Sequence, residues 1–526
     1  MAPFDPATLG PLGPLGPLAE AVQHRLDRMD AEQVTARIWR YDHTVWKPDP
    51  TEIANRLGWL TLPTAMRGQV GELQAFARQA AADGFTHALL LGMGGSSLAP
   101  EMFARTFGSA AGALDLTVLD TTHPAAIRAV EDALDLSATL FIVASKSGGT
   151  LETRSQMEHF WARLGATPTI GDRFVAITDP GTSLDQLATD RGFRAVFRNP
   201  TDLGGRYSAL SLFGLVPAAL IGADLEALLG SAGAMAGELA GDRAAAENPG
   251  AWLGAVMGEA ARAGRDKLTF VLPAAIDTFG DWVEQLVAES TGKEGKGIVP
   301  VPGETLGDPS VYGSDRLFVA LGDHPALEPL QAAGHPVVRL EAGSPERLGA
   351  EILRFEFATA VAGYVLGINA FDQPNVEEAK QATRDILAAG GAAAAGQVDP
   401  GSVAKEGQTG PGDYLGIQAY LQRTPERAAG LQATRLALRD QRHVATTVGF
   451  GPRFLHSTGQ LHKGGPDTGV FLQVVEDTHA VDLPIPGQPY SFGDLIAAQA
   501  LGDLQALRAR GRRVVRLSPD ELSRLG

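Results

Sequence analysis

Residues 143–153, VASKSGGTLET, constrain the fold of this chain more than any other segment. A β-branched apolar run ends in a loop of hydroxyl-bearing residues, one lysine and two glycines, and a helical pattern follows. This order predicts a buried strand whose loop opens onto a helix N-terminus, where backbone amides and hydroxyl groups bind anions. The candidate phosphate ligands in the loop are Ser145, Lys146, Ser147 and Thr150.

A second loop has the same organisation. Residues 88–100, ALLLGMGGSSLAP, place Gly95 and Ser96 directly after another apolar run. Glycines are common structural devices at strand ends, so this loop alone is weak support for a ligand site. The carboxyl ends of parallel strands meet at one edge of a sheet, however, and two such loops can converge on one phosphate.

Short apolar runs alternate with helix-length segments along most of the chain. The first series of runs comprises residues 87–93, 114–120, 138–145, 173–179 and 194–199. A helical stretch at 206–265 separates it from a second series at 267–273, 316–322 and 336–341, and further runs follow at 443–451, 469–477 and 512–518. This alternation predicts an α/β fold with two doubly wound parallel-sheet units in tandem, whose facing strand ends form a cleft.

The same pattern divides the chain into five segments. They are an N-terminal arm with helices (1–55), a first sugar-phosphate-binding unit (56–245), a second unit (246–387), an Ala/Gly-rich linker (388–412) and a C-terminal α/β extension (413–526). The extension either folds as a third small unit or completes the second one, and the sequence leaves both possibilities open.

Composition excludes several classes of function. The formal net charge is −17, which disfavours a nucleic-acid partner and an anionic membrane surface. The chain has no cysteine, so disulfides, zinc–thiolate sites and cysteine nucleophiles are excluded. No signal-peptide pattern opens the sequence, and no apolar run is long enough for a membrane-spanning helix. We therefore expect a cytoplasmic protein that has no membrane partner.

A helical pattern at 280–297 carries a candidate general base. Glu289 shares a helix face with the apolar Leu286, which predicts that its carboxylate points inward. Burial disfavours the charged form of a carboxyl group and so suits proton abstraction. The alternative is a carboxylate at a helix end that is solvated or paired with Lys293 or Lys296.

Two candidate cationic residues lie outside the phosphate loops. Arg206 follows Gly205, and a guanidinium beside closely approaching backbone can stabilise an oxyanion; a structural surface pair is the alternative. Lys380 lies in the pattern FDQPNVEEAKQ, on the same helix face as Val376. A lysine on that face points into a cleft, although lone lysines of this kind more often lie at the surface.

The segment FLHSTGQLHKGGP, residues 454–466, contains His456 and His462. Six residues separate the histidines and no carboxylate lies between them, so the pattern does not favour a metal site. A loop that transfers protons or contacts substrate is one interpretation, and a surface turn is the other.

Five motifs, in this order, are similar to those of the glucose-6-phosphate isomerase family. They are GMGGSSLAP, SKSGGTLET, GGRYSALS, ESTGKEGKG and FDQPNVEEAK, and they span residues 88–380. Residues 37–60 and 454–473 also resemble the isomerase half of bifunctional transaldolase/glucose-6-phosphate isomerases. We therefore expect the chain to correspond to that isomerase module alone.

The resemblance implies two SIS-type αβα sandwich domains and reversible interconversion of glucose 6-phosphate and fructose 6-phosphate through a cis-enediol. It implies no cofactor and no metal, and it implies a homodimer whose sites are completed across the interface. By position, Glu289 would be the base and Arg206, beside Gly205, would stabilise the intermediate. The other implied site residues are Ser145, Ser147, Thr150, Ser96 and Lys146 for the phosphate, Gln373 for substrate contact and Lys380 for ring opening.

One departure concerns the histidine that opens the sugar ring. The family carries it between the glutamate motif and the glutamine–lysine motif, but residues 339–357 of this chain contain no histidine. His324 and His335 lie earlier in that interval, in surroundings that do not match the family. Our hypothesis is that His462 or, as the second choice, His456 supplies this function from the C-terminal loop.

Two alternative functions are consistent with the same loops. One is a dual phosphoglucose/phosphomannose isomerase, which pocket shape around C2 of the sugar would decide. The other is a non-catalytic SIS-type sugar-phosphate regulator, which would lack Glu289 and Lys380 in a common cleft and would carry a DNA- or partner-binding module. The sequence shows no basic recognition helix.

Overall fold

The computed structural model describes residues 15–165, 167–341, 343–390 and 407–525. The first fourteen residues of the predicted N-terminal arm and residues 391–406 of the predicted linker lie outside this part of the chain. Within the described residues, no helix is both long and apolar enough to cross a membrane.

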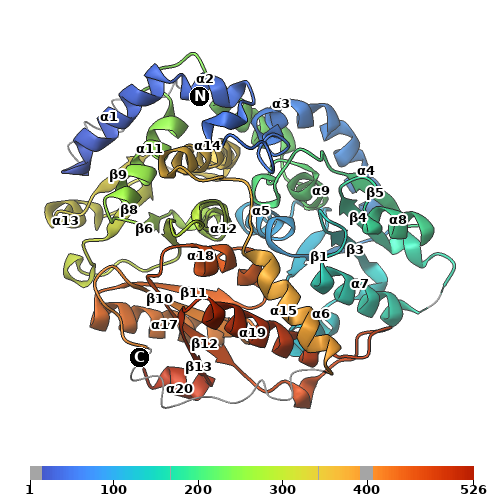
Figure 1. Ribbon diagram of the computed structural model, residues 1–526. Helices are drawn as coiled ribbons and strands as arrows, with labels where there is room; N and C mark the ends of the chain where they lie inside the picture. The colour runs from blue at the N-terminus through green and yellow to red at the C-terminus, as the bar shows by residue number, and fades with distance from the viewer. Residues whose placement is uncertain (1–14, 166, 342, 391–406, 526) are drawn as a thin grey trace.

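The first parallel sheet follows the N-terminal helices (Figure 1). Its strands lie in the order β2-β1-β3-β4-β5. They are β1 (His87–Gly92), β2 (Asp115–Leu119), β3 (Thr139–Ala144), β4 (Phe174–Thr178) and β5 (Ala195–Arg198). The central strand β3 is buried along its whole length, as expected of a parallel strand that helices cover on both faces.

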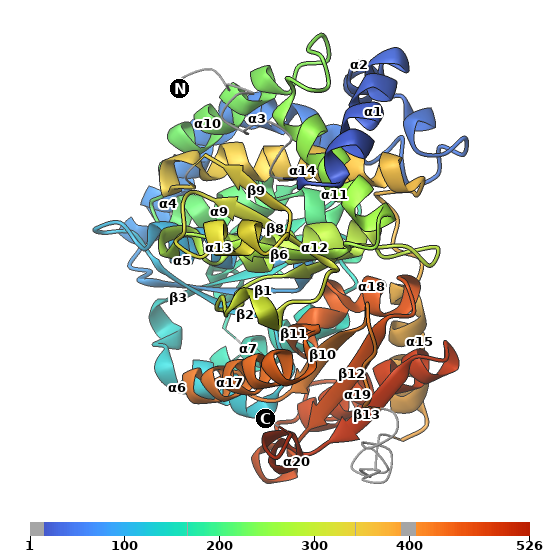
Figure 2. The same ribbon diagram turned by 90° about the vertical axis from the view of Figure 1, so that its left-hand side faces the viewer.

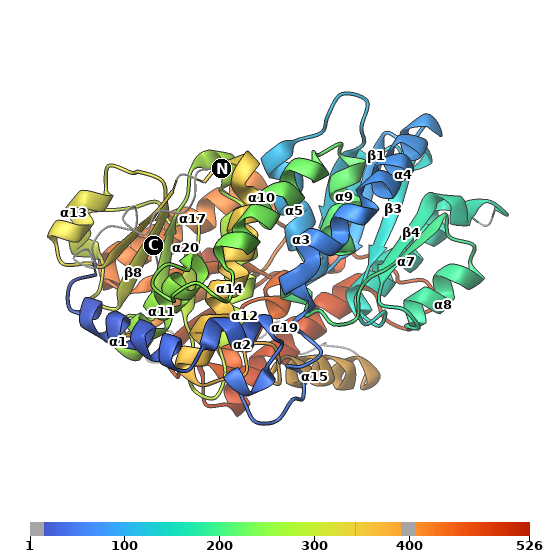
Figure 3. The ribbon, with the colours of Figure 1, turned by 90° about the horizontal axis from the view of Figure 1, so that it is seen from above.

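The second and third sheets are also parallel and have four strands each. The second has the order β7-β6-β8-β9, with β6 (Lys267–Val271), β7 (Val299–Val301), β8 (Arg316–Leu321) and β9 (Val337–Leu340). The third has the order β11-β10-β12-β13, with β10 (Tyr414–Tyr420), β11 (Ala445–Phe450), β12 (Gly469–Val475) and β13 (Arg513–Leu517). The second sheet lies beside the first (Figure 3), and the third lies below the second in the view of Figure 2.

Helices connect these strands and cover the sheets. Those of the first half are α1 (Leu18–Ala31), α2 (Val34–Trp39), α3 (Leu62–Ala65), α4 (Val70–Ala82), α5 (Leu98–Phe107), α6 (Pro124–Ala133), α7 (Leu151–Leu164), α8 (Ser183–Asp190), α9 (Leu212–Leu220), α10 (Leu225–Glu238) and α11 (Pro249–Arg262). Those of the second half are α12 (Phe279–Thr291), α13 (Leu327–Ala332), α14 (Leu348–Leu366), α15 (Val376–Ala388), α17 (Pro425–Arg442), α18 (Gly459–Gly464), α19 (Phe492–Ala509) and α20 (Pro519–Ser523).

Helix α14 forms the centre of the main hydrophobic core. All of its residues except Tyr364 are buried, as expected of a helix that is apolar on every side. It packs closely on α11: a Cβ at Gly258 would lie 2.5 Å from Cβ of Val365, so only glycine permits this approach. The same core continues into α10 and into the helices over the first sheet.

All eleven apolar runs in the sequence form strands, which confirms the α/β fold with doubly wound parallel sheets. Two strands were missed. Strand β7 has three residues and includes Pro300, and β10 contains Gly416, whose Cβ would lie 3.1 Å from the Phe471 ring. Proline and glycine weaken a strand pattern, although both are tolerated at a sheet edge or where another group approaches closely.

Each sheet lies within one of the predicted segments, and the boundaries of these segments remain a prediction. The proposed boundary at 245/246 falls between α10 and α11, which both pack on α14 in one continuous core. The helical spacing expected from Trp282 to Glu289 lies within α12, which ends at Thr291, and Lys293 and Lys296 follow in a turn.

Candidate functional site

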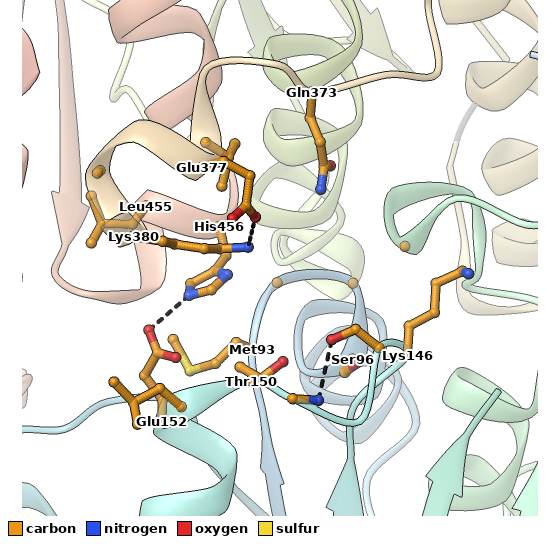
Figure 4. A pocket seen from close by; sticks show the side chains of 18 of the residues that line it. Met93, Ser96, Lys146, Thr150, Glu152, Gln373, Glu377, Lys380, Leu455 and His456 are labelled. Carbon is orange, nitrogen blue, oxygen red and sulfur yellow. Dashed lines mark hydrogen bonds and ion pairs between the residues drawn. The ribbon is translucent and has the colours of Figure 1, made fainter. Parts of the chain in front are cut away.

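A cavity of about 1100 Å³ lies at the carboxyl ends of the strands of the first sheet. The loops that follow β1, β3, β4 and β5 line one side. The other sides come from α12, α15 and two parts of the C-terminal segment, the short helix η13 (Arg453–His456) and α19. Figure 4 shows side chains from the loops after β1 and β3, from α15 and from η13 at this cavity.

The loop between β3 and α7 provides the groups expected of a phosphate site. Lys146, Ser147 and Thr150 line the cavity, and the Gly149 amide donates to Ser147 Oγ over 3.3 Å. Ser145 does not line the cavity; its Oγ lies 2.8 Å from Oγ1 of Thr150. Ser145 therefore orients Thr150 instead of facing the ligand, which revises its predicted direct role.

Lys146 already has a counter-ion in this loop region. Its Nζ lies 2.5 Å from Oδ2 of Asp179, which follows β4. Burial raises the pKa of Asp179, and the nearby Lys146 ammonium only partly opposes this effect. A bound phosphate would thus compete with Asp179 for the lysine.

The predicted glycine loop brings three chain segments together. Gly95 and Ser96 line the cavity, and a Cβ at Gly95 would lie 2.0 Å from the carbonyl oxygen of Gly205. Gly94 has φ +55°, and a Cβ there would lie 2.8 Å from the carbonyl oxygen of His456. Because these glycines lack side chains, the loops that carry Arg206 and His456 can approach the end of β1.

Glu289 and Arg206 form a buried ion pair at the cavity wall. Nη1 of Arg206 lies 3.2 Å from Oε1 of Glu289, and both side chains are almost completely buried. Neither alternative for Glu289 is seen, because Lys293 pairs with Asp372 and Lys296 donates to the Leu366 carbonyl. The inward face predicted for Glu289 is therefore correct.

Arg206 is held in place by nearly all of its donors. Nε donates to Ser290 Oγ over 2.7 Å, and Nη2 donates to the carbonyl oxygens of Ala370 and Asp372 over 2.8 and 3.0 Å. Nη1 also lies 3.2 Å from Oε1 of Gln373, which lines the cavity. The guanidinium is thus a fixed positive charge beside Glu289, which excludes the surface-pair interpretation.

Lys293 adds a second cation close to this pair. Its Nζ contacts both the carbonyl oxygen and Oδ1 of Asp372. Burial, with a smaller effect of the Arg206 charge, lowers the pKa of Lys293 to about 8 in spite of Asp372. Two positive groups therefore surround the position of Glu289.

His456 enters the cavity beside a carboxylate from another domain. Its Nε2 lies 2.9 Å from Oε1 of Glu152 at the start of α7, as the dashed line in Figure 4 shows. Burial raises the pKa of Glu152, but the charge of His456 and its hydrogen bond outweigh burial and hold this pKa below its ordinary value. An imidazole oriented by a carboxylate in this way is the arrangement expected of a general acid–base group.

Gln285 links this histidine to the carboxylate of Glu289. Its Nε2 donates to Oε2 of Glu289 over 3.0 Å and to the backbone carbonyl of His456 over 2.8 Å. The general-base candidate and the imidazole candidate are therefore connected through one side chain of α12.

The structure contradicts the first choice for ring opening, His462. This residue does not line the cavity, and rings of Tyr414, Phe454 and Phe471 surround its imidazole. Its Nδ1 lies 3.1 Å from Nε2 of Gln418. Burial lowers the pKa of His462 well below the ordinary value, so the ring is neutral and inaccessible to a sugar.

Lys380 faces the cavity from α15. Its Nζ lies 2.9 Å from Oε1 of Glu377, and its side chain is 39% exposed, so it can move towards a ligand. Gln373 projects from the loop before α15, above the cavity in Figure 4. Both residues therefore lie where the sequence motif predicted them.

Arg453 anchors the loop that carries His456. Its guanidinium lies 2.5 Å from Glu101 and 3.1 Å from Asp120, both in the first sheet domain. It also lies 3.8 Å from Asp281 on α12. One arginine of the C-terminal segment thus bridges the elements on either side of the cavity.

Sequence reasoning missed three residues that shape the site: Glu152, Gln285 and Gln499. Glu152 lies inside the motif SKSGGTLET, two positions after Thr150, and Gln285 lies on the same helix face as Glu289. Both patterns contained a usable signal. Gln499, in the middle of α19, has no local pattern that distinguishes it from an ordinary buried amide.

Comparisons with known proteins identify the family of the chain. A family model described as phosphoglucose isomerase matches residues 66–299, a region that contains both phosphate loops, Arg206 and Glu289 and ends before Gln373. The chain is 33% identical to the glucose-6-phosphate isomerase of Thermosynechococcus vestitus over 356 residues, which is 58% of this chain and 66%, just under two thirds, of that protein.

Two other curated relatives with the same name extend this coverage. The protein of Rubrobacter xylanophilus is 29% identical over 424 residues, covering 69% of this chain and 94% of the relative. The protein of Citrifermentans bemidjiense is 30% identical over 385 residues, covering 62% of this chain and 72% of the relative. The closer resemblance to bifunctional transaldolase fusions is not tested by these relatives and stays a prediction.

Two solved structures share the fold. A hypothetical protein from Thermus thermophilus superimposes with a TM-score of 0.60 at 25% identity, covering 70% of this chain and 98% of that one. A glucose-6-phosphate isomerase from Chlamydia trachomatis superimposes with a TM-score of 0.58 at 19% identity, covering 70% and 86%. The second likeness concerns the fold alone.

Proposed function

Because the chain belongs to the glucose-6-phosphate isomerase family, we propose that it interconverts glucose 6-phosphate and fructose 6-phosphate with Glu289 as the base. The observation that carries this assignment is the buried pair of Glu289 and Arg206 in the wall of a cavity that also holds a phosphate-type loop. A carboxylate that moves a proton needs a fixed cation nearby to stabilise the charge that develops on the sugar.

The phosphate group would bind in the loop between β3 and α7. Ser147, Thr150 and the loop amides donate to its oxygens, and Lys146 leaves Asp179 to balance its charge. This contact anchors one end of the sugar, so that C1 and C2 extend towards α12. Anchoring a flexible substrate in this way lowers the entropic part of the barrier.

Ring opening is assigned to His456, which replaces His462 in our hypothesis. Glu152 holds the imidazole through Nε2, and the protonated ring donates to the ring oxygen of glucose 6-phosphate as the C1–O5 bond breaks. The C1 hydroxyl gives its proton to solvent water in the cavity as the C1 carbonyl forms. Lys380 and Gln373, which also line the cavity, contact the sugar hydroxyls.

Isomerisation then follows on the open chain. Glu289 removes the proton from C2, and the electron pair moves through the C1–C2 bond to the carbonyl oxygen. Arg206 and the nearby Lys293 stabilise the resulting negative charge, because their positions are held by carbonyl oxygens and by Asp372. Glu289 returns the proton to C1 while the proton of the O2 hydroxyl passes to O1, so that the carbonyl forms at C2 and a hydroxyl remains on C1.

A non-catalytic regulator is not favoured. Such a protein needs the phosphate loop but has no use for a base and a lysine in the same cavity, and Glu289 and Lys380 both line it. Activity on mannose 6-phosphate, a homodimer and a cytoplasmic location remain predictions. The steps above use only side chains of this chain.

A coupled assay tests the proposal. Purified protein is given fructose 6-phosphate, and glucose 6-phosphate is detected with its dehydrogenase. We expect turnover in the wild type and a loss of about 10³-fold in kcat for Glu289→Gln, the size typical of a lost general base. The matched control is Glu356→Gln, a buried glutamate of α14 outside the cavity, which should keep its activity.

Two results would contradict the proposal. An inactive wild type that fructose 6-phosphate nevertheless stabilises against heat would indicate a sensor or another sugar. A Glu289→Gln variant as active as Glu356→Gln would show that another group is the base.

A further inference from the structure

Gln499 contacts the carboxylate that holds His456. Its Nε2 donates to Oε1 of Glu152 over 2.7 Å, the same oxygen that accepts from His456 Nε2 over 2.9 Å. Gln499 lies on α19, lines the cavity and is 3% exposed. One carboxylate oxygen therefore receives two hydrogen bonds, from two different parts of the C-terminal segment.

A threonine orients the Gln499 amide. Oγ1 of Thr122, which is fully buried after β2, donates to Oε1 of Gln499 over 2.6 Å. Since the amide oxygen is occupied by a hydroxyl, the amide nitrogen must face Glu152. The four side chains thus form one chain of hydrogen bonds from Thr122 through Gln499 and Glu152 to His456.

We propose that Gln499 is a positioning residue for ring opening, which orients Glu152 and keeps its carboxylate ionised opposite His456. This inference rests on the proposed function and extends it to a residue of the C-terminal extension. A hydrogen bond to a carboxylate favours its charged form, and it also fixes which oxygen faces the imidazole. Thr122 sets the direction of that hydrogen bond.

Other charged groups also face this carboxylate. Lys380 of α15 contributes a favourable charge at Glu152, and Glu377, on the same helix, pairs with Lys380 and lies near His456. Neither is altered when Gln499 is replaced. A change in the titration of Glu152 when Gln499 is replaced therefore measures the effect of the lost Gln499 hydrogen bond.

The first test compares Gln499→Met with wild type by the pH profile of kcat/KM for fructose 6-phosphate. Methionine fills the same space without a donor, so Glu152 becomes easier to protonate. We expect a loss of about 10-fold at the optimum and an acid limb displaced upward by roughly one pH unit, the size typical of a lost hydrogen bond to a charged partner. Thr122→Val should displace the acid limb by less, and Thr122→Ser, which keeps the hydroxyl, should have the wild-type profile.

Gln473→Met is the matched control. Gln473 of β12 is a buried amide that donates to the Ala500 carbonyl of the same helix α19, and it lies outside the cavity. Its replacement removes this hydrogen bond and the one that its Oε1 accepts from Arg516 Nε, and should lower stability without moving the acid limb. A Gln499→Met profile that coincides with the Gln473→Met profile would overturn the inference.

An NMR titration keeps the test independent of turnover. The side-chain carboxyl carbon signal of Glu152, assigned with a Glu152→Gln variant, is followed against pH in wild type and Gln499→Met. Loss of the hydrogen bond from Gln499 should displace the Glu152 midpoint to higher pH, by roughly one unit. Identical midpoints would overturn the inference even in an active enzyme, whereas an inactive wild type with displaced midpoints would contradict only the proposed function.

Discussion

The imidazole Nε2 of His456 lies 2.9 Å from carboxylate Oε1 of Glu152, although 304 positions separate the two residues in the chain. Glu152 begins a helix of the first sheet domain, and His456 ends a short helix beside the third sheet. The C-terminal extension therefore supplies part of the candidate site within a single chain. The resemblance had implied a site that a second subunit completes. Both residues of this pair come from one chain, and the homodimer remains a prediction.

Replacing each histidine of the C-terminal loop by alanine should distinguish a catalytic role from a packing role. We expect His456→Ala to lower kcat/KM by about 10² to 10³-fold with little change in melting temperature, because it removes an acid from the cavity. His462→Ala should keep its kcat/KM. Its free energy of unfolding should fall by about 2 to 4 kcal/mol, because the substitution leaves a cavity among aromatic rings. Steady-state kinetics and thermal denaturation check both. A His462→Ala variant with the kinetic defect would restore our first hypothesis.

Replacement of Arg206 by lysine should reduce kcat by about 10²-fold, the size typical of a lost electrostatic group. A lysine keeps the charge but cannot span Ser290, the carbonyl oxygens and Glu289 together. The control is Arg354→Lys on α14, where a buried arginine pairs with Glu351 outside the cavity. Equal loss of kcat in both variants would indicate a general packing effect.

Removal of the loop lysine should act on substrate binding. We expect Lys146→Ala to raise KM for fructose 6-phosphate by about 10-fold with a smaller effect on kcat, since a charge-assisted contact to phosphate contributes about 1.5 kcal/mol. The matched control is Lys47→Ala, whose ammonium pairs with Glu294 and lies outside the cavity. An unchanged KM in Lys146→Ala would place the phosphate elsewhere.

Ionisation of Glu284, a partly buried residue of α12, should make the free energy of unfolding depend on pH. Burial, with a smaller effect of Asp281, raises the pKa of Glu284 to about 8. Between about pH 4.5 and 8 the folded state keeps this proton while the unfolded state loses it, so the free energy of unfolding falls as pH rises. Above pH 8 the folded protein carries an unfavourable charge.

Glu284→Gln removes this effect. We expect the variant to exceed wild type in stability by about 1 to 2 kcal/mol at pH 8.5 and to match it near pH 4.5, because only the ionised carboxyl is penalised. Denaturation curves over this pH range check it, with the exposed Glu226→Gln of α10 as control. A constant difference between Glu284→Gln and wild type at all pH values would contradict the interpretation.

Most of the secondary structure could be predicted from local pattern. Each of the eleven runs is a short stretch rich in β-branched and other apolar residues between helix-length segments, which is why each was predicted as a strand. The exceptions, β7 and β10, contain proline or glycine, and their pairing partners compensate for these residues in the folded protein. These pairing partners lie far away in the sequence, so a short stretch of residues does not reveal them.

The sequence alone also determined the phosphate loop, the inward face of Glu289 and the position of Arg206 after two glycines. These are local features: the loop motif, the helical spacing and the glycine pair each occupy fewer than twenty consecutive residues. Only the tertiary structure decided that His456 and not His462 reaches the cavity. It also decided that Glu152 and Gln285 contact His456 and that Gln499 contacts Glu152. The physical reason is that these contacts join segments that are distant in sequence. Whether an imidazole lies in a polar cavity or among aromatic rings depends on how those segments pack.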